Sequence, residues 1–456
     1  MAAIGTQYHS NPEERKHGVE FHTYCTKSIS LALDRTLQTM QAISLTEIFT
    51  RFRGKKTTVR ISRQFEDLYD RLLNPSYPNS ETETTPINTS TPKDLTNHFN
   101  TRTRSEDIQS NWLLWVETES RQRLSCLCFI FDIQQSMYHQ QKRTKPYVDP
   151  TILYTPCSEV VWELTNAADW ATNETGNSTG KTINVVQHQS TQEDQLELSH
   201  FAQSVMICFL TSQLPLPAGP DCYYSSEFQI HNPHPTILEL VTLFPASSMV
   251  NTYLALYHTP LRDLLAVSGD TWVFSQKISH QSHFHEAQSR LKAWSSSPAA
   301  ATATHHACRI LRSEFSAPCS PFSVHNKNLP SLDLANYWSL NVAALICWAF
   351  GHRVGGSNGT SLQNTLDIYA DLDFETSPEA SENMRTEALT YLDSMLELDV
   401  KDLLTSKATM RGETHCIIDA VRTKLEIDSL GSHCMALVDS IGVLRRIREG
   451  GRGKWF

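Results

Sequence analysis

The sequence has no Cys-x-x-Cys pair, and no pair of cysteines is followed by a pair of histidines at the spacing of a zinc finger. Structural zinc in such modules needs four thiolate or imidazole ligands at close intervals. The chain therefore offers no zinc-binding framework of that kind. Its 11 cysteines are scattered singly, apart from Cys126 and Cys128, which suits free thiols in a reducing intracellular compartment.

Excess positive charge and long apolar runs are also missing. With 39 basic against 49 acidic residues the formal net charge is -10, so no global basic field favours nucleic acid. No apolar run reaches the roughly 18–20 residues that a membrane-spanning helix needs. The first residues show no pattern of a secretory signal, and we therefore expect a soluble intracellular protein.

Three stretches approach enzyme or metal motifs but lack the context that those motifs need. Residues 355–359 fit Gly-x-Ser-x-Gly, but they follow a predicted helix instead of a strand. Residues 176–182 approach a phosphate-binding loop with one residue too few between the glycines. Acidic residues over 371–382 imitate a calcium loop, yet Thr376 stands where the loop requires glycine. We predict no catalytic residue and no metal ligand, and we expect that the chain is not an enzyme.

The most strongly patterned stretch spans residues 111–141. Glu117 with Arg121, and Glu119 with Arg123, lie four residues apart with the acid first, the favourable order on a helix surface. The segment that follows is largely apolar, with side chains recurring at intervals of three and four residues. We predict a central helix, buried on several sides, whose charge pairs hold it in register against its neighbours.

Asp132 lies inside this apolar segment. An isolated carboxylate is costly to bury, so we expect Asp132 either to meet an arginine from another helix or to face solvent. A role in sensing a ligand is the alternative hypothesis.

This segment and the turn after it resemble the middle homology region of the fungal-specific transcription factor domain. The likeness lies in a Trp-Leu-Leu-Trp start, a Glu-Ser-Arg-Gln-Arg-Leu run, a Phe-Ile-Phe-Asp segment, and a proline turn before a tryptophan-containing helix. The family-signature residues are Trp112, Trp115, Glu119, Arg121, Arg123, Leu124, Phe131, Asp132 and Trp162. Residues 258–265, 337–351 and 454–456 are similar to the branch whose DNA-binding part consists of Cys/His zinc fingers.

The resemblance implies the regulatory domain of a nuclear factor that controls transcription by RNA polymerase II, for example of a specialised biosynthetic pathway. In the family, such a domain controls a DNA-binding domain through intramolecular contacts, self-association or a small-molecule effector. The implied partners are a second copy or a related transcription factor, and coregulators; DNA is reached only indirectly, and no membrane is involved. No cofactor is expected here, because the zinc belongs to a DNA-binding module that is missing from this chain.

The remaining pattern predicts an all-α architecture. Residues 1–170 form its N-terminal part, which includes the middle homology region and a disordered loop at 74–95. A polar linker at 171–195 leads to residues 196–456, the C-terminal helical part of the same regulatory region.

Particular helices follow from the same periodicity. Apolar spacing predicts single helices over 29–52, 237–265 and 381–404, among others. Thr155 before Pro156 predicts the start of the tryptophan-containing helix, because proline is favoured at the first helical position.

Basic clusters at 51–56 and 445–454 fit nuclear import or phosphate contact, although a solvated helix end is the commoner explanation. The pairs at 415–416 and 433–434 each join histidine to cysteine. A helix between them would hold them about 25 Å apart, too far for one metal site.

Two alternatives come from other classes of protein. One is an all-helical enzyme with a fold like that of terpene synthases, which would need an acidic metal-binding motif such as Asp-Asp-x-x-Asp that the sequence lacks. The other is an interaction scaffold without a transcriptional role.

Overall fold

The computed structural model is built from helices, with one short pair of strands. It describes residues 1–6, 12–31, 36–53, 61–73, 105–140, 142–145, 147–149, 151–173, 183, 198–215, 234–269, 272–273, 276–277, 280–316, 336–351, 378–405, 414–429 and 435–450. Within these residues eighteen helices make up nearly all of the regular structure, which confirms the all-α class. The loop at 74–95, most of the stretch at 171–195 and the motif-like stretches at 176–182, 355–359 and 371–377 lie outside the described residues.

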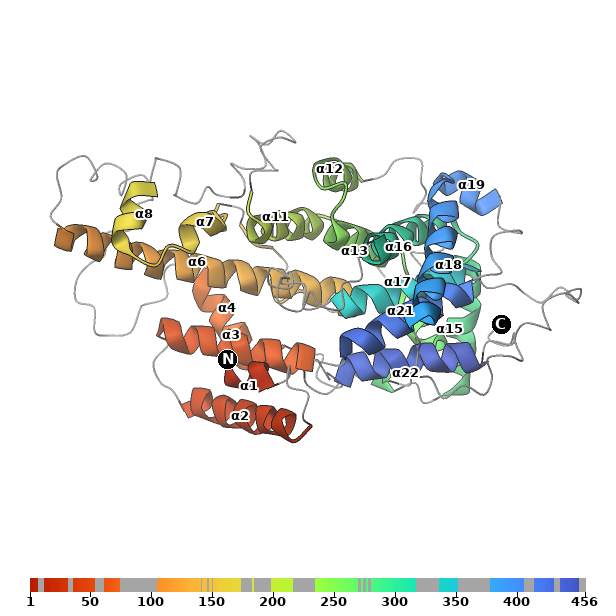
Figure 1. Cartoon of the computed structure of the whole chain (residues 1–456), viewed down its shortest axis with the longest axis horizontal. Coiled ribbons are helices and arrows are strands. Elements are labelled where there is room, and N and C mark those ends of the chain that lie inside the picture. Colours follow the sequence, from red (N-terminus) through yellow and green to blue (C-terminus); the bar gives the residue numbers. More distant parts are fainter. Residues whose placement is uncertain are drawn as a thin grey trace, which may run out of the picture.

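The N-terminal half is arranged around one long helix, α6 (Ser105–His139). Figure 1 shows α6 running along the molecule, with α3 and α4 on one side and α7, α8 and α11 on the other. In chain order the helices of this half are α1 (Ala2–Gly5), α2 (Pro12–Leu31), α3 (Leu37–Arg53), α4 (Arg63–Leu73), α6, α7 (Glu159–Trp162), α8 (Ala167–Asn173) and α11 (His200–Ser212).

The apolar segment of α6 is buried on several sides. Cys126 and Cys128 are fully buried and Phe129 is nearly so, because α3, α4, α11 and α13 (Ser248–Tyr257) pack against different faces of the helix. The helix ends at His139, and Gln140 adopts a φ of 49°, the left-handed conformation that commonly terminates a helix.

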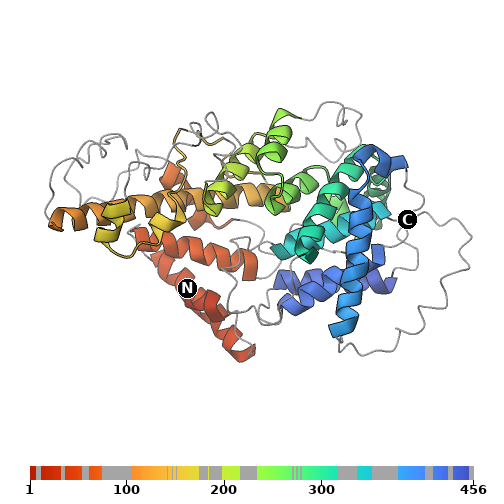
Figure 2. The ribbon, with the colours of Figure 1, turned by 45° about the horizontal axis from the view of Figure 1, so that its top comes forward.

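The C-terminal half gathers at the other end of the molecule (Figures 1 and 2). Its centre is α16, which packs against α13, α17, α18 and α19. Ala300, Ala303 and Ala307 of α16 are fully buried, so the neighbouring backbones lie close to it. The helices and strands of this half are α12 (Pro235–Leu243), α13, α14 (Leu261–Val267), β1 (Trp272–Val273), β2 (Gln276–Lys277), α15 (Gln281–Trp294), α16 (Pro298–Ser316), α17 (Asn336–Gly351), α18 (Pro378–Leu396), α19 (Val400–Thr405), α21 (Thr414–Ser429) and α22 (Met435–Gly450).

One apolar core joins the two halves. The rings of Tyr138 on α6 and Tyr253 on α13 meet edge to face with centroids 5.8 Å apart. His139, at the end of α6, lies with its ring centroid 6.0 Å from that of Trp338 on α17. Burial lowers the pKa of His139 to about 4, so this ring is neutral at physiological pH. Among the described helices, none has the length and apolarity needed to cross a membrane.

Two predicted single helices are divided in the structure. The helix over 29–52 is wrong as one element, because α2 ends at Leu31 and α3 begins only at Leu37. The helix over 237–265 is three helices, since Pro245 and Pro260 stand in the turns between α12, α13 and α14. Proline lacks the N–H that a helix interior requires and restricts the residue before it.

Side-chain caps shift two other boundaries. The predicted helix over 381–404 divides before α19, where Oδ1 of Asp399 accepts hydrogen bonds from two backbone N–H groups of the next turn. The tryptophan-containing helix α7 begins at Glu159 and not at Pro156, because Ser158 is its N-cap. Ile183, within the stretch interpreted as a linker, is fully buried, and its N–H donates to the carbonyl oxygen of Leu153 at 3.0 Å.

A buried ion pair fastens α14 to α15. Nε and Nη2 of Arg290 donate to the two carboxylate oxygens of Asp263 at 2.9 and 2.7 Å, and the Asp263 side chain is 4% exposed. Arg290→Met leaves this carboxylate buried without its cation, so we expect the free energy of unfolding to fall by about 2 kcal/mol. Urea unfolding followed by circular dichroism measures the change.

The double variant Asp263→Leu with Arg290→Met is the control for this prediction. It removes the charge together with its partner, and we expect it to be more stable than the single variant. A double variant less stable than Arg290→Met would contradict this account.

Candidate functional site

Three tryptophans meet where α7 and α8 cover the first half of α6. The ring centroid of Trp115 lies 6.2 Å from that of Trp162 and 5.5 Å from that of Trp170. Trp170 is 2% exposed, whereas the other two rings are partly exposed. One turn earlier, the indole Nε1 of Trp112 is buried and has no hydrogen-bond partner among the described residues. These rings form an apolar contact that holds α7 and α8 on α6.

Glu119 and Arg123 hold the backbone of Cys157 from both sides. Oε1 of Glu119 accepts hydrogen bonds from Nε of Arg123 and from the backbone N–H of Cys157, each at 2.9 Å. Nη2 of Arg123 donates to the carbonyl oxygen of Cys157, also at 2.9 Å. Because Glu119 is 3% and Arg123 15% exposed, water competes little for these bonds. We call these three residues the Cys157 clamp.

The guanidinium of Arg123 extends the clamp to two further helices. Its central carbon lies 4.5 Å from the ring centroid of Trp162 on α7 and 5.7 Å from that of Phe201 on α11. A cation over an aromatic face is attracted by the ring quadrupole, and more strongly where water is excluded. Arg123 thus joins α6, α7 and α11.

Cys157 is held through its backbone and is a poor nucleophile. Burial, together with the negative charge of Glu119, raises the pKa of its thiol to about 12. A thiol with such a pKa stays protonated at physiological pH and is chemically inert.

The other predicted pair on α6 has a different environment. Arg121 and Glu117 are joined at 2.9 Å, but their side chains are 38% and 52% exposed. Pairs of this kind on a helix surface contribute only a few tenths of a kcal/mol. The two pairs look equivalent in the sequence, yet only Glu119 with Arg123 connects α6 to the rest of the fold.

Asp132 meets neither of the partners expected from the sequence. It is 1% exposed, and its two carboxylate oxygens accept hydrogen bonds from the backbone N–H groups of Thr144 and Lys145 at 2.6 and 3.1 Å. The predicted solvent exposure is therefore wrong, and the arginine whose charge acts on Asp132, Arg143, belongs to the loop after α6 and not to another helix. Burial raises the pKa of Asp132, and the two N–H bonds oppose that shift. The carboxylate ties the chain that leaves α6 back onto the helix.

Arg51 corrects the interpretation of the first basic cluster. It pairs with Glu47 at 2.9 Å, and the two side chains are 9% and 2% exposed, so Arg51 does not belong to a solvated helix end. Its Nη1 donates to the carbonyl oxygen of Phe131 at 3.1 Å, and its guanidinium lies between the rings of Phe65 and Phe131, about 5 Å from each centroid. Lys55 and Lys56 of the same cluster lie outside the described residues.

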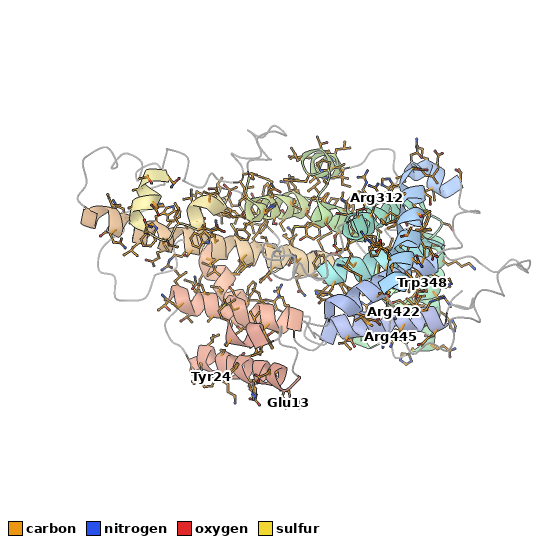
Figure 3. All side chains as sticks on the ribbon, in the orientation of Figure 1. Glu13, Tyr24, Arg312, Trp348, Arg422 and Arg445 are labelled. Atoms are coloured by element: carbon orange, nitrogen blue, oxygen red, sulfur yellow. The ribbon has the colours of Figure 1, made fainter. Side chains whose placement is uncertain are left out.

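The second basic cluster faces the acids of α21. Arg445 pairs with Glu426 at 2.7 Å and Arg448 with Asp419 at 2.9 Å. Figure 3 shows Arg445 on α22 close to Arg422 on α21, which shares Glu426. The described arginines of this cluster are thus engaged within the fold, and residues 451–454 lie outside the described part.

Metal-binding geometry is not found in the described part of the chain, where no three His, Cys, Asp or Glu side chains gather as a metal ion would need. His415 and Cys416 begin α21, which continues without a break to Ser429. Residues 433–434 lie outside the described residues.

The family-signature residues do not converge on one pocket. Trp115, Glu119, Arg123 and Trp162 gather at the contact of α6 with α7 and the chain before it, and Trp112 lies one turn earlier on α6. Leu124, Phe131 and Asp132 are buried farther along α6, and Arg121 lies at the surface. They span the helix and together attach it to the surrounding elements.

Sequence reasoning missed several contacts of the same kind. Glu47 and Arg51 have the same four-residue spacing as the pairs on α6, so this signal was available. Trp170 has a local signal as well, because Asn166 caps its helix by accepting from the N–H of Asp169 at 2.8 Å. The role of the Cys157 backbone has no sequence signal.

The Cys157 clamp generates a matched mutational test. Arg123→Met leaves Glu119 buried without its cation and Cys157 without a donor, so we expect the free energy of unfolding to fall by about 3 kcal/mol. Arg121→Met, which alters the exposed pair two residues earlier, should change it by less than about 0.5 kcal/mol. Equal effects of the two substitutions in urea unfolding would contradict the clamp.

Asp132 generates a prediction about pH. Because its folded-state pKa is raised, its contribution to stability is full at pH values below its unfolded pKa and is lost as the pH rises through the folded pKa. Asp132→Asn lacks this titration and keeps only one acceptor oxygen. We expect the variant to be less stable than the wild type, by a margin that shrinks as the pH rises above the unfolded-state pKa of about 4.

Urea unfolding at several pH values measures this margin. The matching substitution Asp402→Asn, at an exposed aspartate of α19, controls for general effects of pH on the chain. If the stability difference between Asp132→Asn and the wild type widens as the pH rises, burial is not the main influence on the pKa of Asp132.

The chain matches no family model, no curated protein and no solved structure in the comparisons. A function must therefore be inferred from the contacts of its own residues and from the motifs on α6.

Proposed function

We propose that this chain is the regulatory domain of a fungal transcription factor, acting in the nucleus on transcription by RNA polymerase II without contacting DNA itself. The observation that carries the proposal is the placement of the family-signature residues. Trp115, Trp162, Glu119, Arg123 and Phe131 lie in contacts between α6 and its neighbours, and among the described residues none of the nine belongs to a group of side chains that could hold a metal ion. Residues placed in this way stabilise the packing of helices, which is the role we expect for the signature of a regulatory domain.

The position of α6 supports a regulatory role. Near its N-terminal half it holds α7 and α8 through the tryptophans and the Cys157 clamp, and at its other end it reaches α13 and α17. A partner that binds one arrangement of α7 and α8 more tightly than another would therefore bias the position of a helix that reaches the C-terminal half. Coregulators, a related transcription factor or a small-molecule effector are candidates for that partner.

Tethering tests this function. The full chain is fused to an unrelated DNA-binding module, and we expect transcription of a reporter carrying that module's sites to change several-fold relative to the module alone. Arg123→Met should reduce this effect, because it removes contacts that hold α7 and Cys157 on α6, whereas Arg121→Met should retain it. Immunoblotting of each fusion separates lost function from lost protein.

The outcomes distinguish the alternatives. A fusion that is present in the nucleus but leaves the reporter unchanged would favour a scaffold without a transcriptional role. Strong thermal stabilisation of the purified chain by magnesium together with inorganic diphosphate would favour an all-helical enzyme, because such enzymes bind the substrate diphosphate through magnesium.

A further inference from the structure

Helix α2 lies at the outer edge of the molecule, on the side of α3 that faces away from α6 (Figures 1 and 2). Its inner face carries Gly18, His22 and Ile29, and it packs mainly against α1 and α3. The His22 ring stacks on Phe49 with centroids 4.6 Å apart, and its Nε2 lies 3.2 Å from the carbonyl oxygen of Thr46. These contacts fix which face of α2 is turned outward.

That outward face presents large apolar side chains to solvent. Phe21 is 47%, Tyr24 72% and Leu31 81% exposed. Together with the exposed His17 and Ser28 they follow one another at spacings of four, three, four and three residues. This is the spacing of the a and d positions of a two-helix coiled coil, with large apolar side chains at three of the five positions. Figure 3 shows Tyr24 on the outer side of α2.

The charges beside this seam specify a partner. Glu20 and Lys27 both lie on the same flank of the stripe, seven residues apart, and both are exposed. In an antiparallel pair of helices the residues of corresponding flanks face each other. If Phe21 of one copy packs against Tyr24 of a second copy, Glu20 of the first comes opposite Lys27 of the second, and the two-fold axis repeats the contact.

We propose that α2 pairs with α2 of a second copy of this chain in this antiparallel, two-fold arrangement. A helix with the acid and the base on one flank is complementary to itself, as a two-fold interface requires. A parallel pair would instead place Glu20 opposite the exposed Cys25, with no opposite charge. The inference stands apart from the proposed function, because the dimer and the transcriptional effect are measured independently.

The size of the surface sets the expected strength. Two such helices bury on the order of 1,000 Å² in total, at the low end of specific interfaces, so we expect micromolar dimerisation. The Glu20 carboxylate already lies 3.2 Å from Nδ1 of His17 in its own helix. Pairing with Lys27 of the second copy therefore replaces one weak exposed ion pair by another and adds little affinity. Most of the affinity therefore comes from the aromatic layer, and the charges choose the orientation.

Sedimentation of the full chain over a range of concentrations tests the proposal. Tyr24→Glu puts a charge into the centre of the pair twice and should weaken dimerisation more than about a hundredfold. Tyr147→Glu, the same change at a 75% exposed tyrosine outside α2, is the control and should leave dimerisation unchanged. Both residues are exposed, so at concentrations where the wild type is monomeric the thermal unfolding temperature of both variants should match that of the wild type.

Charge exchange tests the orientation. Glu20→Lys alone places like charges opposite each other at both ends of the pair and should weaken dimerisation roughly tenfold. Adding Lys27→Glu to Glu20→Lys should restore it. A wild-type chain that stays monomeric at all concentrations, a dimer that Tyr24→Glu leaves intact, or a double variant as weak as the single one would each overturn the proposal.

Discussion

Covering the apolar segment of α6 is the constraint on which the rest of this fold depends. A helix whose apolar residues occupy much of its circumference cannot be stable at a surface, so other elements must approach it from several directions. Helices α3, α4, α11 and α13 do so, although they come from segments far apart in the chain. The burial that results removes water from every polar group that α6 carries along that length.

The buried charged groups of Glu119, Asp132 and Arg51 are balanced by groups from another segment. The carboxylates of Glu119 and Asp132 accept backbone N–H groups of the chain that follows α6, and Arg51 donates to a carbonyl oxygen of α6 itself. Backbone groups in irregular segments need partners as much as the side chains do. One hydrogen bond thus satisfies both a buried charge and a loop, which is why these segments follow α6 closely.

The sequence predicts the parts of this arrangement that are local. The periodicity of α6 and the four-residue spacing of its charge pairs depend on neighbours within one or two turns. Both can therefore be predicted from the sequence. The hydrogen bonds of Asp132 with Lys145 and of Glu119 with Cys157 depend on where a later loop packs against α6. The spacing of side chains along the sequence does not predict that position. The prolines at 245 and 260 are sequence signals for helix ends. The apolar spacing continues past both of them, and a prediction based on that spacing joins three helices into one.

The alanine surface of α16 has a mechanical consequence. Alanine has no rotatable side-chain dihedral that changes its shape, so Ala300, Ala303 and Ala307 cannot absorb a displacement of α13, α17 or α18 by changing rotamer. A push on one of these helices is therefore passed to the next as movement of whole backbones. The alanine-lined part of α16 should therefore transmit strain between its neighbours more directly than the part that carries Ile310, Leu311 and Phe315.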